Sequence, residues 1–271
     1  MPDIQMIVTD VDGTLIDHTE HIPEDLIKTV RRCQNAGIVF ALSTGRTNEL
    51  AAPIIKSLGI TDPCVEANGA YILQNDRCLL SHGFSLQPVR HLIERADALG
   101  LTVTISDTHV ESAVSETDYV RQHQKFGNRF KKLLPLDEID WEHGQFQKLM
   151  IMDEHDTGKL TAIRTEMEQF HNIYWITRYS NRAIELGPKD CSKASGVREL
   201  AALMGIPLEN VMACGDFWND FEMISEVGWG VAVGNALPEL KAAARYAAKG
   251  QYASGVIEAV NALCFGEQIG I

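Results

Sequence analysis

Apolar runs alternate with helical patterns near the N-terminus. Residues 4–8 and 38–42 are largely apolar, which is typical of strands buried on both faces of a parallel sheet. Apolar residues at helical spacing follow each run, and Gly37 and Gly59 stand where the C-termini of the two helices are expected. Strand, helix, strand and helix at this spacing predict a parallel sheet with helical crossovers.

The same alternation returns in the C-terminal part of the chain. It predicts a helix at about 193–204, a strand at 210–213 and a second helix from about 219. A second strand at 229–233 and two final helices at 238–248 and 254–263 follow. Because the two ends share one pattern, we expect them to form a single core.

The middle of the chain has a different pattern. Helical patterns flank its predicted strands, which alternate apolar and polar residues. The strands are predicted at 101–105, 109–114, 147–152, 173–177 and 183–186. Such strands predict an α+β domain with an antiparallel sheet. The expected fold class is therefore α/β, with a Rossmann-like parallel-sheet core at 1–82 and 187–271 and an inserted α+β domain at 83–186.

Acidic residues outnumber basic ones, 37 to 24 in 271 residues, which leaves a formal charge of −13. Nucleic-acid binders and proteins held on anionic membranes carry basic surfaces, so we expect neither partner. The chain has no signal-peptide pattern, no apolar run of about 18 residues and no C-x-x-C pair among its six cysteines. These features predict a cytoplasmic protein with reduced thiols.

Two carboxylates follow the first predicted strand. Asp10 and Asp12 stand at its carboxyl end, where α/β sheets place their ligands, and Gly13 allows the chain to turn away. One can serve as nucleophile or metal ligand and the other as general acid or base. The alternative is an acidic turn that caps the next segment, and Gly13-Thr14 after an apolar strand favours the functional interpretation.

A second acidic loop, Gly215–Asp220, also follows an apolar strand. Read alone, Asp216 and Asp220 are equally consistent with helix caps. Because acidic residues at the ends of parallel strands can converge on one hard cation, the loop together with Asp10 and Asp12 predicts a metal site. Mg²⁺ prefers such oxygen ligands. Asp220 is expected either to bind the metal directly or to support the residues that do.

Two weaker signals concern anion binding. Thr44 and Gly45 offer a hydroxyl and a backbone N–H at the start of a predicted helix, although Ser/Thr-Gly is also common turn chemistry. A lysine before the helix that restarts the core is a further candidate. Both Lys189 and Lys193 qualify, and Lys193 follows a plausible helix cap, Ser192.

These segments together resemble the four ordered motifs of the haloacid dehalogenase superfamily, phosphatases that use an aspartyl-phosphate intermediate. The segments are Asp10-Val11-Asp12-Gly13-Thr14, Thr44-Gly45-Arg46, Lys193 and Gly215-Asp216-x-x-Asn219-Asp220. Asn68-Gly69-Ala70 and residues 231–236 further resemble the Cof-type sugar-phosphate phosphatases. Thr44 and Lys193 are separated by 148 residues, which places the insertion between the second and third motifs, as in Cof-type members with an α+β cap.

The resemblance implies a mechanism. Asp10 attacks the phosphorus, and Asp12 protonates the leaving group and then activates water. Mg²⁺ is implied as cofactor, held by Asp10, by the main-chain carbonyl of Asp12 and by Asp216. The residues implied to bind the phosphoryl group are Val11, Thr44, Gly45, Lys193 and Asn219.

The function expected is therefore Mg²⁺-dependent hydrolysis of small phosphorylated metabolites, with sugar phosphates as the first candidates, by a monomer or small homo-oligomer. A phosphomutase of the same superfamily and a non-catalytic metabolite-binding regulator are the alternatives. A pure binder has no need for both Asp10 and Asp12, which speaks against the second alternative.

A basic stretch lies within the inserted domain. Arg121, Lys125 and Arg129 recur every four residues in a run without acidic residues, so they are predicted to form one basic face of a helix. A solvated surface is the favoured interpretation, and a role in holding an anionic substrate is the alternative.

Overall fold

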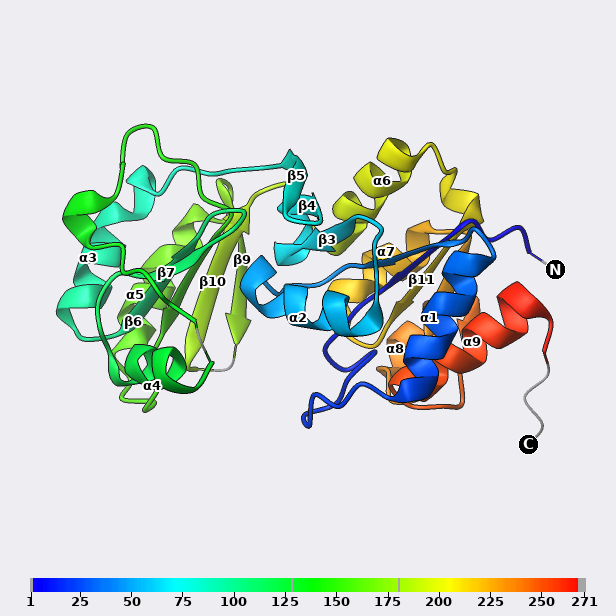
Figure 1. Ribbon diagram of the computed structural model, residues 1–271. Coiled ribbons are helices and arrows are strands. Elements are labelled where there is room, and N and C mark those ends of the chain that lie inside the picture. Colours follow the sequence, from blue (N-terminus) through cyan, green and yellow to red (C-terminus); the bar gives the residue numbers. More distant parts are fainter. Residues whose placement is uncertain (1, 128, 180, 268–271) are drawn as a thin grey trace. The chain divides into compact units, whose positions relative to one another are not determined.

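The computed structural model describes residues 2–127, 129–179 and 181–267 (Figure 1). The chain divides into two compact units. The core unit contains the chain up to Arg46, Leu50–Leu79 and the chain from Ser192 onward. The cap unit contains Thr47–Glu49 and Leu80–Cys191. The domain boundaries at residues 82 and 186 stay a prediction.

A five-stranded parallel sheet forms the centre of the core unit, in the order β13-β12-β11-β1-β2. Its strands are β1 (Met6–Thr9), β2 (Val39–Leu42), β11 (Val211–Gly215), β12 (Trp229–Ala232) and β13 (Tyr246–Ala247). β1 lies between β11 and β2, and both neighbours run parallel to it. The carboxyl ends of β1, β2 and β11 therefore meet at one edge of the sheet, which is where such sheets place ligands.

Helices surround this sheet in the core unit (Figure 1). They are α1 (Glu24–Asn35), α2 (Asn48–Leu58), α6 (Lys193–Met204), α7 (Phe221–Glu226), α8 (Pro238–Ala243) and α9 (Ala253–Phe265). All of them except α6 contribute side chains to the apolar cluster at the sheet, whereas α6 packs against α7 and residues 64–74. α1 buries Leu26, Val30 and Cys33 because their spacing puts them on one face. α6 begins where the Ser192 side chain accepts a hydrogen bond from the Ser195 N–H, and it ends at a left-handed Gly205.

A small sheet of β3 (Cys64–Glu66), β4 (Tyr71–Gln74) and β5 (Arg77–Ser81) was not predicted from the sequence. β3 and β4 are antiparallel and are joined by the short 3₁₀ helix η1 (Ala67–Gly69). Asn75 and Asp76, between β4 and β5, both have positive φ angles, as a tight primed hairpin turn requires.

The cap unit contains a five-stranded antiparallel sheet in the order β7-β6-β8-β10-β9. Its strands are β6 (Thr102–Ser106), β7 (Glu111–Ala113), β8 (Lys148–Met152), β9 (Tyr174–Tyr179) and β10 (Ala183–Pro188), and its helices are α3 (Arg90–Ala98), α4 (Asp118–Gly127) and α5 (Leu160–Met167). Val103, Ile105, Leu149 and Ile151 form an apolar cluster with residues of α3 and α5. The expected α/β class with an inserted antiparallel domain is confirmed.

Two details of the predicted elements are wrong. The helix expected over 238–248 ends at Ala243, and Tyr246–Ala247 instead adds the edge strand β13. The basic stretch is helical only as far as Gly127, so Arg129 lies outside α4. Among the residues that the structure describes, no helix is long and apolar enough to cross a membrane.

Candidate active site

The first acidic motif lies in the turn that follows β1. The Asp10 N–H donates to the Cys214 carbonyl at 3.0 Å, which extends the pairing of β1 with β11 by one residue. The chain then turns at Gly13, where φ is +90°. As a result the two carboxylates separate: Asp10 is buried, whereas the Asp12 side chain is 56% exposed.

Lys193 joins two of the predicted motifs directly. It is the first residue of α6, and its Nζ lies 2.5 Å from Asp10 Oδ1 and 2.7 Å from Asp220 Oδ1. Burial opposes the charged form of this lysine, but the two carboxylates outweigh that effect and hold its pKa above the ordinary value. The other lysine candidate, Lys189, donates instead to the His171 carbonyl in the cap unit.

The loop after β11 is organised by Asp220. Its Oδ2 accepts hydrogen bonds from the N–H groups of Asp216 and Phe217 at 3.0 and 3.1 Å, while its Oδ1 faces Lys193. Both oxygens of Asp220 are thus engaged in the absence of a metal, and its role as a ligand or as a support stays a prediction. Asp216 is held from the other side, where the Thr14 hydroxyl donates to its Oδ1 at 2.9 Å.

Glycine allows these loops to approach one another. A Cβ at Gly13 would lie 2.4 Å from Asp216 Oδ2, and a Cβ at Gly215 would lie 2.4 Å from the Asp220 Cβ. Real Cβ atoms do not come this close to other atoms, so any larger residue at either position would displace a carboxylate.

Three carboxylates form a cluster that can hold a cation. Ligand atoms of Asp10, Asp216 and Asp220 all lie within 4.8 Å of one another. Burial raises the pKa of Asp10 to about 8, against the opposing effect of Lys193, and burial also raises the pKa of Asp216. With one ammonium against three carboxylates, the ionised cluster keeps two negative charges. A hard divalent cation fits this set of oxygen donors in both charge and chemistry.

The Asp12 side chain lies outside this cluster. Arg46 binds the Asp12 carboxylate with two hydrogen bonds, Nε to Oδ2 at 2.9 Å and Nη2 to Oδ1 at 2.6 Å. The metal ligand predicted from Asp12 is its main-chain carbonyl, and that assignment stays a prediction. Arg46 Nη2 also contacts Glu20 at 2.6 Å. The sequence placed Arg46 in a motif but predicted no role for it, because its partner lies 34 positions away.

The Thr44-Gly45 segment lies in a loop at the end of β2. α2 begins only at Asn48, so the expectation that these residues start a helix is wrong. The loop is held by the small sheet, because the Asn68 N–H donates to the Thr44 carbonyl at 2.9 Å and the Thr44 N–H donates to the Val65 carbonyl at 3.0 Å. A Cβ at Gly45 would meet the Asn68 amide at 3.0 Å. Asn68 therefore packs closely against this loop, a contact that the sequence motif Asn68-Gly69-Ala70 did not predict.

Two asparagines complete the surroundings of the site. Asn235 Nδ2 donates to the Gly13 carbonyl at 2.7 Å, and its Oδ1 accepts from the Tyr252 N–H at 2.8 Å. Asn235 thus fixes the first motif's turn from 222 positions away. Asn219, one of the predicted phosphate-binding residues, is exposed in the 3₁₀ helix η6 (Trp218–Asp220), and Val11, which follows Asp10 in the chain, is buried.

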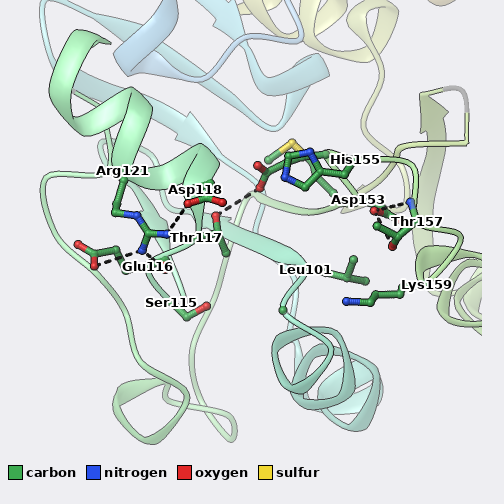
Figure 2. Close-up of a pocket in the computed structure, with 13 residues that line it drawn as sticks. Leu101, Ser115, Glu116, Thr117, Asp118, Arg121, Asp153, His155, Thr157 and Lys159 are labelled. Atoms are coloured by element: carbon green, nitrogen blue, oxygen red, sulfur yellow. Dashed lines mark hydrogen bonds and ion pairs between the residues drawn. The ribbon is translucent and has the colours of Figure 1, made fainter.

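A pocket of about 310 Å³ lies within the cap unit, lined by α4 and by the segment around His155 (Figure 2). Several of its charged groups already have partners: Arg121 contacts Asp118 and Glu116, and Glu154 accepts from the Thr102 and Thr117 hydroxyls. Arg121 is thus occupied by acidic neighbours. The pocket presents no arrangement comparable to the carboxylate and lysine cluster of the core unit.

The predicted basic face does not form. Arg121 lies on α4, whereas Arg129 follows the helix and pairs with the buried Glu111 at 2.7 Å. These two arginines therefore neutralise acidic groups of the cap unit.

Comparison with known proteins finds relatives that are hydrolases and phosphatases. A model of haloacid dehalogenase-like hydrolases matches residues 7–260. The putative phosphatase YkrA of Bacillus subtilis (strain 168) is 27% identical over 262 residues, which cover 96% of this chain and 98% of that protein. The 5-amino-6-(5-phospho-D-ribitylamino)uracil phosphatase YcsE of the same organism is also 27% identical, over 96% of this chain and 95% of that one.

A solved structure agrees with these relatives. The crystal structure of a haloacid dehalogenase-like hydrolase from Bacteroides thetaiotaomicron has a TM-score of 0.80 and 27% identity, and covers 95% of this chain and 98% of that one. The resemblance seen in the four motifs is confirmed. The chain belongs to the haloacid dehalogenase-like hydrolases, and within them it is a phosphatase, a phosphoric monoester hydrolase.

Proposed function

We propose that the protein is a Mg²⁺-dependent phosphatase that hydrolyses small phosphorylated metabolites, chiefly sugar phosphates, through an aspartyl-phosphate on Asp10. The observation that carries this proposal is the buried Asp10 carboxylate, which Lys193 contacts at 2.5 Å beside two further carboxylates. Phosphoryl transfer requires chiefly positioning and neutralisation of charge, and this cluster supplies both.

Each residue of the site has a separate proposed role in the reaction. Asp10 attacks the phosphorus with the oxygen that Lys193 does not hold. Asp12 donates a proton to the leaving oxygen and then takes one from the attacking water. Thr44, the N–H groups of Gly45 and Val11, and Asn219 bind the phosphoryl oxygens, and Lys193 neutralises their charge.

The metal is proposed to bind at the carboxylate cluster. Asp10, Asp216 and the main-chain carbonyl of Asp12 would be its ligands, and Asp220 positions Lys193 and the Asp216 loop. When bound, Mg²⁺ offsets the negative charge of the phosphoryl group and of the carboxylates.

Sugar phosphates are proposed as the substrate class on two grounds. The Cof-type motifs resemble those of sugar-phosphate phosphatases, and the relative YcsE is named for a substrate with a phosphorylated ribityl group. A phosphomutase would move phosphate within the substrate, so measured release of inorganic phosphate separates the two activities.

Two variants test the roles of the carboxylates. Asp10→Asn is expected to abolish Mg²⁺-dependent release of phosphate from p-nitrophenyl phosphate, whereas the exposed control Asp25→Asn on α1 retains it. Asp12→Asn is expected to release about one equivalent of p-nitrophenol in a burst and then to stall, because the phosphorylated Asp10 cannot be hydrolysed. Undiminished steady turnover in Asp10→Asn would refute the assignment of the nucleophile.

A further inference from the structure

The turn that joins β3 to β4 has an unusual backbone. Ala67, Asn68 and Gly69 have φ angles of +48°, +55° and +91°, and no other three consecutive residues of the described chain share positive values. A residue with a Cβ seldom adopts this left-handed region, although asparagine tolerates it better than alanine. Ala67 and Asn68 are both buried. Such a backbone persists only where its surroundings hold it in place.

One side of this turn holds the loop at the end of β2. The N–H groups of Asn68 and Ala67 donate to the Thr44 and Arg46 carbonyls, each at 2.9 Å. The Asn68 amide lies against Gly45, because a Cβ at Gly45 would be 3.0 Å from both Nδ2 and Oδ1. The Thr44 hydroxyl accepts from the Arg46 N–H at 3.1 Å, so its own proton can still be donated. The turn therefore fixes the loop that presents Thr44 and Gly45.

The other side of the turn fits against the start of α6. A Cβ at Gly69 would overlap the Ser192 carbonyl oxygen, and a Cβ at Gly196 would overlap the Val65 side chain of β3. Glycine at both positions lets the two backbones approach closely. Lys193 directly follows Ser192 and begins α6. The turn thus contacts two of the elements that supply the proposed phosphoryl-binding groups.

The backbone of the turn does not require the Asn68 amide. Glycine adopts positive φ angles freely, so a glycine at this position would make the same turn without burying a polar side chain. Burying an amide costs free energy unless the amide makes compensating contacts. A role in holding Gly45 accounts for the presence of this buried amide.

We propose that Asn68 is a positioning residue for phosphoryl binding, which keeps the Thr44 hydroxyl and the Gly45 N–H in place relative to the Lys193 ammonium. The proposal rests on the phosphatase function proposed above and adds a residue to it. The carboxylate cluster is built by β1 and the loop after β11, whereas this turn contacts the loop after β2 and the start of α6. Loss of the Asn68 amide should therefore weaken the binding of phosphate and leave the binding of Mg²⁺ unchanged.

Two substitutions of Asn68 separate the effect of shape from that of charge. Asn68→Gly permits the same backbone and removes the amide, so the loop can shift. It is expected to raise the inhibition constant of inorganic phosphate against p-nitrophenyl phosphate at least about 10-fold, since a misplacement of about 1 Å can cost about 100-fold. Its dissociation constant for Mg²⁺, measured by calorimetry without phosphate, should equal that of the wild type. Asn68→Asp keeps the shape of the side chain but should bind phosphate more weakly still, because its carboxylate beside Gly45 repels the phosphate dianion.

Asn75 provides the matched control. It is an asparagine of the same small sheet, it has a φ of +49°, and it is exposed. Asn75→Gly and Asn75→Asp should keep the wild-type inhibition constant for phosphate and the wild-type kcat/KM. Urea unfolding of the four variants measures any change in stability separately from these properties of the folded enzyme.

A double variant tests whether Asn68 acts through the loop. In a Thr44→Ala background, Asn68→Gly should raise the phosphate inhibition constant by a smaller factor than in the wild type, because the loop already lacks one of the groups that Asn68 positions. Losses that simply multiply would show that the two residues act independently, and the proposal would be wrong.

Distinct outcomes separate this proposal from the proposed function. An unchanged phosphate inhibition constant in both Asn68 variants overturns the positioning role. Equal weakening of phosphate and Mg²⁺ binding in Asn68→Gly, or failure of both variants to fold, shows a general structural role and also overturns it. In each of these cases, wild-type turnover of p-nitrophenyl phosphate leaves the phosphatase function intact. Absence of phosphate release by the wild type from every ester overturns the function itself.

Discussion

Lys193 is the side chain whose removal should reveal most about the site. Its ammonium lies 2.5 Å from one carboxylate and 2.7 Å from another, and the side chain is only 2% exposed. Lys193→Met keeps a side chain of similar length and removes the charge. The variant leaves Asp10 and Asp220 buried, without their shared cation, and with Asp216 as a third acidic neighbour.

The expected cost follows from burial. Removing one partner of a buried ion pair destabilises a protein by about 3–5 kcal/mol, because the remaining charge stays desolvated. Asp10 can limit the cost by binding a proton, since burial already raises its pKa to about 8. We therefore expect Lys193→Met to lose about 3 kcal/mol of unfolding free energy in EDTA, and to lose at least about 100-fold in kcat.

Urea unfolding in EDTA measures the cost. Lys28→Met is the matched control, because Lys28 contacts Glu24 and Asp25 on the surface of α1 with 61% of its side chain exposed. Exposed ion pairs contribute about 0–1 kcal/mol, so the control should change little. Added Mg²⁺ should offset nearly all of this loss in Lys193→Met, by about 3 kcal/mol at 100 times the dissociation constant. A loss in EDTA no larger than that of the control would refute the electrostatic account.

Three further predictions follow from particular contacts. Gly13→Ala should weaken Mg²⁺ binding by at least about 10-fold in calorimetry, because its Cβ would lie 2.4 Å from Asp216 Oδ2 at a φ of +90°; unchanged affinity would contradict this reasoning. Arg46→Ala should lower kcat more for alkyl phosphates than for p-nitrophenyl phosphate, whose leaving group needs no proton, because Arg46 orients the Asp12 carboxylate; equal losses for both esters would exclude this role. Burial raises the pKa of Glu66 to about 8 from 4.5, so between these pH values the folded state holds a proton that the unfolded chain releases. The contribution of this proton to the free energy of unfolding is therefore complete below pH 4.5 and is lost progressively as the pH rises to 8. Glu66→Gln should therefore lose less stability than the wild type between pH 5 and pH 8.5 in urea unfolding, and equal losses in the two proteins would contradict the prediction.

The core strands could be predicted because they are buried on both faces. Residues 4–8 and 38–42 are largely apolar; the second run encloses β2, and β1 overlaps the first run and ends one residue after it. The small sheet of β3, β4 and β5 escaped notice because its strands have only three to five residues each, too few for a periodic signal. The length of the basic helix was overestimated, because charge spacing alone does not determine where a helix ends.

The sequence by itself determined that acidic residues stand at the ends of β1 and β11 and that Lys193 begins a helix, because strand ends and helix caps are local features. Tertiary structure alone decided which of these groups meet. Lys193 contacts Asp10 from 183 positions away, and Thr14 contacts Asp216 from 202. It also placed Asp220, and not the Asp12 side chain, in the carboxylate cluster, because Gly215 admits Asp220 while Arg46 binds Asp12. Such pairings depend on the order of strands in the sheet, which no local pattern of residues encodes.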